Sequence, residues 1–130
     1  MGNKRSNLDS RQSQRGKRAY HSGHAAEEQV ARHYASKGAE LLETCWRGKA
    51  GEIDLIFRQA EEIVFVEVKS SRDFARAAQS LRPDQISRIS KAAEEYCGAL
   101  PTGLLTPMRI DVALLDQTGR IEILDNAIGH

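Results

Sequence analysis

The 130-residue chain has little of what several classes of protein depend on. Its only two cysteines, Cys45 and Cys97, match no paired metal-binding motif and give no sign of a disulfide framework. No stretch approaches the roughly 20 apolar residues of a membrane span. The first residues of the given sequence do not contain the apolar run that is typical of a signal peptide. We therefore expect a cytoplasmic protein with free thiols and no membrane partner.

Several nucleotide-binding patterns are also absent. The chain has no glycine-rich phosphate loop and no internal repeats. It also lacks the runs of aromatic residues on which single-stranded bases stack. The composition excludes these routes to function but leaves catalysis by charged side chains open.

The length fits one domain, and the distribution of charge divides the chain into two parts. Residues 1–18 contain six basic residues against Asp9 alone, a net charge of +5. The remainder has 13 basic and 17 acidic residues, a net charge of −4. We expect residues 1–20 to form a flexible basic tail, because Leu8 is the single large apolar residue within residues 2–18, and residues 21–130 to form the domain. The basic tail suits nucleic acid, although a solubilising role fits it equally well.

The most informative stretch, residues 51–69, reads GEIDLIFRQAEEIVFVEVK. It contains two strand-like apolar runs separated by a short polar turn. Each run carries an acid among apolar neighbours, Asp54 in the first and Glu67 in the second. An acid inside a buried strand costs free energy unless something compensates it, and a divalent cation is the usual compensation where carboxylates converge.

A hairpin turning at residues 59–62 predicts which side chains face each other. The expected pairs are Arg58 with Ile63, Ile56 with Phe65, Asp54 with Glu67, and Glu52 with Lys69. Opposed residues point to the same face, so the two carboxylates would lie side by side next to a lysine. Like charges placed opposite each other destabilise a sheet, which favours a metal site over a scaffold. A solvated acid–base pair is the alternative, but both faces of both strands are largely apolar.

The pattern of Asp54 followed by Glu67-Val68-Lys69 resembles the PD-(D/E)xK signature of restriction-endonuclease-like nucleases. Three longer motifs are similar to those of the small bacterial YraN-like family, which is placed in that fold. They are GEIDLI at residues 51–56, FVEVK at residues 65–69 and the run Arg109-Ile110-Asp111-Val112. The resemblance extends from about residue 23 to residue 125. It implies an α/β fold with a restriction-endonuclease-like mixed β-sheet core flanked by helices.

The resemblance also implies a function, that of a metal-dependent nuclease hydrolysing phosphodiester bonds in DNA or RNA with Mg²⁺ or Mn²⁺. Asp54 and Glu67 would hold the metal, and Lys69 would orient or activate the attacking water. In such nucleases an acid from the first helix often completes the site, and here that acid is Glu27. By spacing alone, Glu27 could equally be a solvated first-turn glutamate favoured by the helix dipole.

One departure from the family keeps a second function open. Gln85 stands where the family commonly has a lysine, and a glutamine brings no charge to a phosphate. The alternative is therefore a nucleic-acid-binding or repair-associated module with little or no turnover. A domain of this size would cover only a few base pairs, which favours a homodimer or a partner protein.

Apolar periodicity predicts a helix over residues 25–37 and a second that begins with Asp84 as its N-cap and ends at Gly98. Strands are expected over residues 39–47, in the two arms of the hairpin, and over residues 108–115 and 120–124, whereas residues 74–81 are ambiguous. The first three strands can form an antiparallel meander. Because a helix follows them, the fourth strand can lie parallel to a strand of the meander. The predicted result is a mixed sheet between helices.

Overall fold

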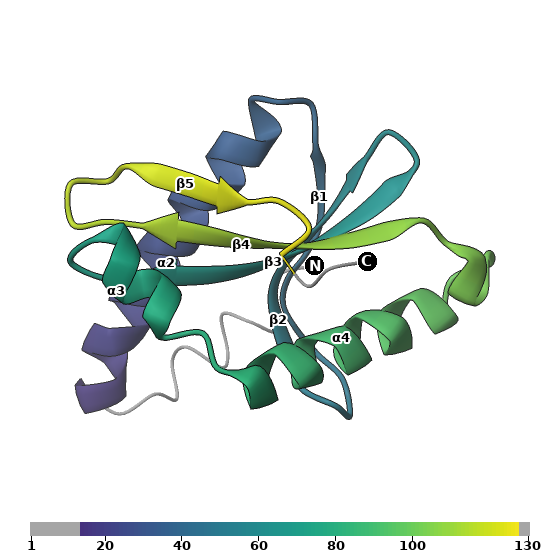
Figure 1. Ribbon diagram of the computed structural model, residues 1–130, viewed down its shortest axis with the longest axis horizontal. Coiled ribbons are helices and arrows are strands. Elements are labelled where there is room, and N and C mark those ends of the chain that lie inside the picture. The colour runs from purple at the N-terminus through teal and green to yellow at the C-terminus, as the bar shows by residue number, and fades with distance from the viewer. Residues whose placement is uncertain (1–13, 128–130) are drawn as a thin grey trace.

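The computed structural model describes residues 14–127, in which one five-stranded mixed sheet lies between helices (Figure 1). The elements follow the chain as α2 (Gln14–Ala35), β1 (Glu40–Arg47), β2 (Glu52–Gln59), β3 (Glu62–Ser70), α3 (Phe74–Gln79), α4 (Pro83–Gly98), the 3-10 helix η1 (Gly103–Leu105), β4 (Met108–Leu115) and β5 (Ile121–Leu124). The strands lie side by side in chain order. The predicted α/β class and mixed sheet are thereby confirmed. No helix of the described residues is long and apolar enough to cross a membrane.

The β2–β3 hairpin has the predicted register. Arg58 lies opposite Ile63, and Ile56 lies opposite Phe65. Gln59 and Glu62 form the pair nearest the turn, so the loop consists of Ala60 and Glu61. The φ angle of Ala60 is 56°, the sign that tight two-residue hairpin loops need at their first position. An alanine therefore adopts here the conformation for which hairpins usually recruit glycine or asparagine.

β3 and β4 are parallel, with pairs running from Ile63 and Met108 to Ser70 and Leu115. Parallel neighbours need a long crossover, and residues 71–107, which contain α3, α4 and η1, provide it. β1, β2 and β3 form an antiparallel meander, and β5 returns antiparallel to β4. The predicted topology is confirmed.

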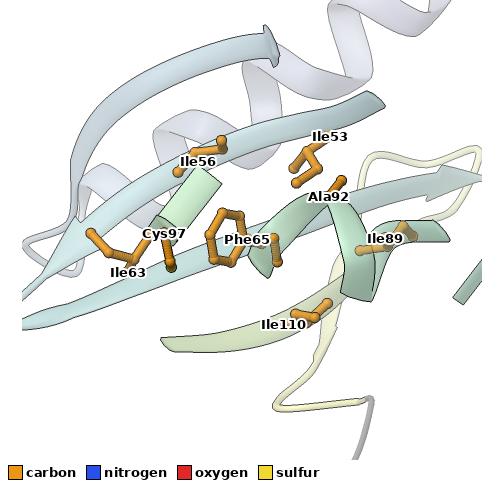
Figure 2. Close-up of a cluster of buried hydrophobic side chains, with 9 residues drawn as sticks. Ile53, Ile56, Ile63, Phe65, Ile89, Ala92, Cys97 and Ile110 are labelled. Carbon is orange, nitrogen blue, oxygen red and sulfur yellow. The ribbon is translucent and has the colours of Figure 1, made fainter. Parts of the chain in front are cut away.

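Successive residues of the central strands are buried on opposite faces of the sheet, as the pleat requires. On the α4 face, Phe65 lies at the centre of a cluster of isoleucines and small α4 side chains (Figure 2). On the α2 face, Val30 and Tyr34 pack against Phe57 and its neighbours, and the Tyr34 and Phe57 rings stack with centroids 4.6 Å apart. Two cores therefore hold α2 and α4 against opposite sides of the same strands.

The start of α2 differs from the prediction. The helix begins at Gln14 and not at residue 25, so residues 14–20 of the predicted tail belong to it. The predicted start was late because the apolar pattern begins only at Ala26, the first buried position of the helix that is described. Residues 1–13 of the predicted tail lie outside the described residues.

The start of α4 is also corrected. Pro83 is the first helical residue and Arg82 is the N-cap, so the prediction of Asp84 as N-cap is wrong. Proline suits the first helical position because the N–H that it lacks would have no helical partner there. Asp84 lies in the first turn instead, where its Oδ2 accepts a hydrogen bond from Arg88 Nη1 at 3.2 Å. The ambiguous segment forms the short helix α3, capped by the Asp73 carboxylate, which accepts the Arg76 N–H at 2.8 Å.

Asp111 in β4 is 0% exposed, but three hydrogen-bond donors compensate the charge of its carboxylate. Its carboxylate accepts hydrogen bonds from the Tyr34 hydroxyl at 2.6 Å, Arg109 Nε at 3.1 Å and the Asn126 backbone N–H at 2.9 Å. The Arg109 guanidinium also donates to Glu62 at 2.9 Å. This network joins α2, the hairpin, β4 and the segment after β5, and we assign it a structural role.

Removing one member of the network should cost stability. We expect Tyr34→Phe to lower the free energy of unfolding by about 1.5–3 kcal/mol, because a hydrogen bond to a charged acceptor is lost. Asp111→Ala should lower it by about 3–5 kcal/mol, because the Tyr34 hydroxyl, Arg109 Nε and the Asn126 N–H all lose their acceptor. Ser36→Ala, which removes an exposed hydrogen bond to the His33 carbonyl, is the control and should change stability by no more than about 0.5 kcal/mol. Urea denaturation measures all three, and a Tyr34→Phe variant as stable as wild type would contradict the assignment.

Candidate active site

The β2–β3 hairpin opens at the end opposite its turn. The last backbone pair there is Leu55 with Val66, so the predicted pairs of Asp54 with Glu67 and Glu52 with Lys69 lie beyond the ladder. The Asp54 carboxylate takes over as acceptor, because its Oδ2 receives the Val68 backbone N–H at 2.8 Å. The N–H and C=O of one strand residue point to the same edge, so the Val68 carbonyl also faces Asp54.

Glu67 lies on the α4 face of β3 and is only 8% exposed. Its Oε2 accepts a hydrogen bond from Gln85 Nε2, in the first turn of α4, at 2.9 Å. The same oxygen lies 3.5 Å from Lys69 Nζ, in an ion pair in which both side chains are largely buried. Lys69 and Glu67 share a face because they are two residues apart on one strand. The predicted neighbourhood of Glu67 and Lys69 is therefore present, and α4 adds Gln85 to it.

Glu27 approaches Asp54 from α2, on the other side of the sheet. Its Oε1 lies 3.6 Å from Cys45 Sγ in β1, a thiol hydrogen bond. Cys45 itself has a φ of 50°, a left-handed conformation that non-glycine residues seldom adopt. Glu27 therefore lies near Asp54, while its role in the site stays a prediction. Cys45 is a neighbour of Glu27 that no sequence motif marked.

Asp54 and Glu67 line one pocket of about 220 Å³, together with Glu52, Gln85, Arg88 and Ile89. Glu27 lines a separate pocket of about 180 Å³ with His24 and Thr44. A larger pocket, of about 330 Å³, lies against Tyr34 and Arg109, but the polar groups of both are already engaged with Asp111. The pocket of Asp54 and Glu67 is therefore the candidate active site.

The loop between β1 and β2 is fastened to α4 beside this pocket. The Glu95 carboxylate accepts the backbone N–H of Lys49 at 2.9 Å and that of Ala50 at 3.4 Å. A Cβ on Gly48 would come within 2.5 Å of both Glu95 Oε1 and the Trp46 ring, so any other residue there would have to displace these side chains. The fastened loop fixes where β2 begins, and with it the position of Asp54 relative to α4.

The acids of the site are poorly compensated, in contrast to Asp111. Burial, and then the charge of Asp54, raise the pKa of Glu27 to about 7. Burial, and then the charge of Asp54, also raise the pKa of Glu67 to about 8, against the opposing effect of Lys69. Burial raises the pKa of Asp54 as well, although the hydrogen bond from Val68 opposes it. A cation placed between these acids would relieve the strain of burying them.

The donor set fits a hard divalent cation. Asp54, Glu67 and the Val68 carbonyl offer oxygen ligands of the kind that Mg²⁺ and Mn²⁺ prefer. Within residues 14–127 no three His, Cys, Asp or Glu side chains are grouped so as to hold a metal ion by themselves. Mg²⁺ is commonly bound through one or two carboxylates while it keeps several waters, so a pair of acids and a carbonyl are sufficient.

The architecture and the pocket define a class of protein, an α/β protein whose mixed sheet carries a buried acidic site where its hairpin opens. The sequence model of the uncharacterised protein family UPF0102 matches residues 26–115, and the chain belongs to this family. The predicted membership in the YraN-like family is thereby confirmed.

The chain is similar to UPF0102 proteins of several bacteria over most of their length. A UPF0102 protein of Ruegeria pomeroyi is 56% identical over 116 residues, which are 89% of this chain and 94% of that protein. One of Roseobacter denitrificans is 49% identical over 115 residues, 88% of this chain and 89% of that protein. One of Cereibacter sphaeroides strain KD131 is 48% identical over 112 residues, 86% of this chain and 96% of that protein.

The raised pKa of Glu67 predicts how the stability of the metal-free protein depends on pH. Between the ordinary glutamate value of 4.5 and about 8, the folded state keeps a proton on Glu67 that the unfolded chain has released. The folded state then binds more protons, so stability that is present below the ordinary pKa is lost as the pH rises toward the folded value. We expect the free energy of unfolding in EDTA to fall between about pH 5 and about pH 8.

The matched variants isolate the group responsible. Glu67→Gln should remove much of this decline and, at the higher pH, should be at least as stable as wild type, because it ends the repulsion with Asp54. Glu122→Gln, at an exposed position of β5, is the control and should keep the decline. If wild type and Glu67→Gln lose stability equally with pH, Glu67 is not the group that titrates.

Proposed function

We propose that this protein is a metal-dependent nuclease that hydrolyses phosphodiester bonds in DNA or RNA. The observation that carries the proposal is the joint burial of Asp54 and Glu67 in one pocket, with raised pKa values and Lys69 at 3.5 Å from Glu67. Perturbed carboxyl groups with a specific charged neighbour in a pocket are characteristic of functional sites. The resemblance of these residues to the PD-(D/E)xK signature adds the reaction class and the restriction-endonuclease-like core.

Each side chain has a task that follows from its position. Asp54 and Glu67 hold Mg²⁺ or Mn²⁺, with the Val68 carbonyl on the same edge. When bound, such a cation polarises a phosphoryl oxygen and lowers the pKa of a coordinated water. The Lys69 ammonium, fixed by Glu67, orients the attacking water and stabilises negative charge that develops on the phosphate. Glu27 accepts a proton at the edge of the site, because its pKa lies near neutrality.

Two further side chains, both from α4, line the pocket, one suited to the phosphate and one to the Glu67 carboxylate. The Arg88 guanidinium lines the pocket while Asp84 holds it at 3.2 Å, so a cation is available at the rim. The Gln85 amide, whose Nε2 donates to Glu67, keeps that carboxylate oriented toward the pocket. The pocket therefore combines an acidic floor for a metal with a basic rim for a phosphate.

The metal site is tested by calorimetric titration of Mn²⁺ into the protein. We expect wild type to bind the ion with release of protons, since raised pKa values leave the acids partly protonated at neutral pH. Affinity should increase as the pH rises from about 6 to about 8. Glu67→Gln should lose most of the binding, whereas Glu122→Gln should bind as wild type does. Equal binding by Glu67→Gln and wild type would overturn the assignment of the ligands.

The reaction is tested by a cleavage screen across linear, flapped, branched and structured DNA and RNA with Mg²⁺ and with Mn²⁺. On any substrate that wild type cuts, Lys69→Ala should reduce the rate by about 10²–10⁴-fold while it keeps the fold and metal binding. Lys37→Ala, in the turn that follows α2, is the control and should cut normally. A Lys69→Ala variant that cuts at the wild-type rate would contradict the role given to Lys69.

A second function has a specific observation in its favour. Gln85 occupies the position where the family commonly has a lysine, and it bonds to Glu67 at 2.9 Å without adding charge. A nucleic-acid-binding module of low turnover would tolerate this exchange. Metal binding without cleavage of any substrate in the screen would favour this second function over the first.

A further inference from the structure

Two leucines stand out on the surface of the described chain. Leu104 is 74% exposed and Leu105 is 90% exposed, whereas the next large apolar residue, Leu41, is 45% exposed. Both lie in η1, within residues 100–107, the loop that joins α4 to β4. Single exposed leucines are ordinary, but two adjacent ones at the tip of one loop form an apolar projection that calls for a partner.

The loop holds this projection in a fixed shape. The Leu105 N–H donates to the Thr102 carbonyl at 3.1 Å, and the Thr106 N–H donates to the Gly103 carbonyl at 3.0 Å. The Thr106 hydroxyl donates to the Gly103 carbonyl as well, at 2.6 Å. Prolines at 101 and 107 restrict the backbone at both ends. The two leucines are therefore presented to water by an ordered loop, and ordering them on binding would cost little.

A pocket of about 450 Å³ lies beside the projection. Ile63, Leu100, Pro101 and Pro107 contribute apolar walls. Arg58 and Glu61, on the β2–β3 hairpin, contribute charges of opposite sign, and Arg58 Nε also lies 3.9 Å from Glu40 Oε1 in an exposed ion pair. The same loop thus supplies the projection and one wall of the pocket. Figure 1 shows that the loop after α4 lies at the end of the helix that is far from its first turn.

We propose that residues 100–107 and the neighbouring β2–β3 turn form the interface of a two-fold homodimer. In this dimer Leu104 and Leu105 of each copy enter the pocket of the other. A projection and a pocket side by side on one surface complement themselves under a two-fold axis, which is the arrangement of most homodimers. Arg58 of one copy then meets Glu61 of the other, and the converse pair forms on the opposite side of the axis.

The two charges are the reason to choose a second copy as the partner. A partner of another kind would have to match one basic and one acidic residue with an acid and a base of its own. A second copy supplies both the acid and the base. A two-fold axis that runs between Arg58 and Glu61 places each of them against its unlike counterpart in the other copy. No other occupant requires so little beyond what this chain contains.

The proposed interface leaves the candidate active site untouched. Gln85 lies in the first turn of α4, whereas Leu100 follows the end of this 16-residue helix. A helix of that length spans about 24 Å, so changes in the loop lie far from Asp54 and Glu67. The dimer is therefore testable whether or not the protein is a nuclease.

Sedimentation equilibrium of the full chain, from about 1 to about 100 µM, tests the proposal. We expect wild type to dimerise in this range. Leu105→Glu should raise the dissociation constant at least about tenfold, because a carboxylate would be buried against the apolar walls of the pocket, and should leave the melting temperature of the monomer unchanged. Leu41→Glu, on the edge strand β1, is the matched control and should dimerise as wild type does.

Charge exchange tests the pairing across the axis. Arg58→Glu and Glu61→Arg should each associate more weakly than wild type, because each homodimer then has like charges in contact. An equimolar mixture of the two variants should restore association, since both contacts in the heterodimer are again between unlike charges. A monomeric wild type, a Leu105→Glu variant that dimerises normally, or a mixture that associates no better than its components would overturn the proposal.

Discussion

The site depends on one substitution of hydrogen-bond partners, in which a side chain replaces the backbone. Where β2 and β3 part, the Val68 N–H has no strand residue to donate to, and the Asp54 carboxylate accepts it at 2.8 Å. Without that acceptor, either the strands would have to remain paired or a buried N–H would be left without a partner, at a cost of about 1–3 kcal/mol. The hydrogen bond between Asp54 and Val68 therefore both ends the pairing of the hairpin strands and fixes the position of the Asp54 carboxylate. Everything else in the site, from Glu67 to the first turn of α4, lines the space that this opening creates.

The sheet buries acids in two places and treats them in opposite ways. Asp111 has a tyrosine, an arginine and a backbone N–H directed at its carboxylate. Asp54 and Glu67 have one lysine, one amide and the Val68 N–H between them, and Asp54 lies near a third acid, Glu27. The same fold that compensates the buried charge of Asp111 thoroughly leaves the other pair only partly compensated, with raised pKa values. The contrast within one molecule distinguishes Asp111, which we assign a structural role, from the pair that we propose as a metal site more clearly than burial does.

The sequence determines much of this arrangement through local rules. Two-residue periodicity sets the hairpin register, because any slip would move Ile56 and Phe65 out of the core. Acids among apolar neighbours identified Asp54 and Glu67, and one strand placed Lys69 beside Glu67. Other features depend on distant segments. The ladder stops after Leu55 because Asp54 replaces a backbone acceptor, and the contacts of Cys45 with Glu27 and of Gln85 with Glu67 depend on how β1, α2 and α4 pack against the strands. The early start of α2 and the capping of α4 were missed because neither leaves an apolar pattern.

The register shift within β1 affects whether strands of other molecules can pair with the edge of the sheet. β1 is an edge strand of eight residues, long enough to recruit a foreign strand by backbone pairing. Its pairing with β2 shifts by one residue between Leu41 and Glu43, and Cys45 turns the backbone into the left-handed region. An irregular edge bearing Glu40, Glu43 and Arg47 is a poor template for sheet extension, and the opposite edge, β5, has only four residues. The irregularity that brings a thiol next to Glu27 thus also protects the protein from edge-to-edge aggregation.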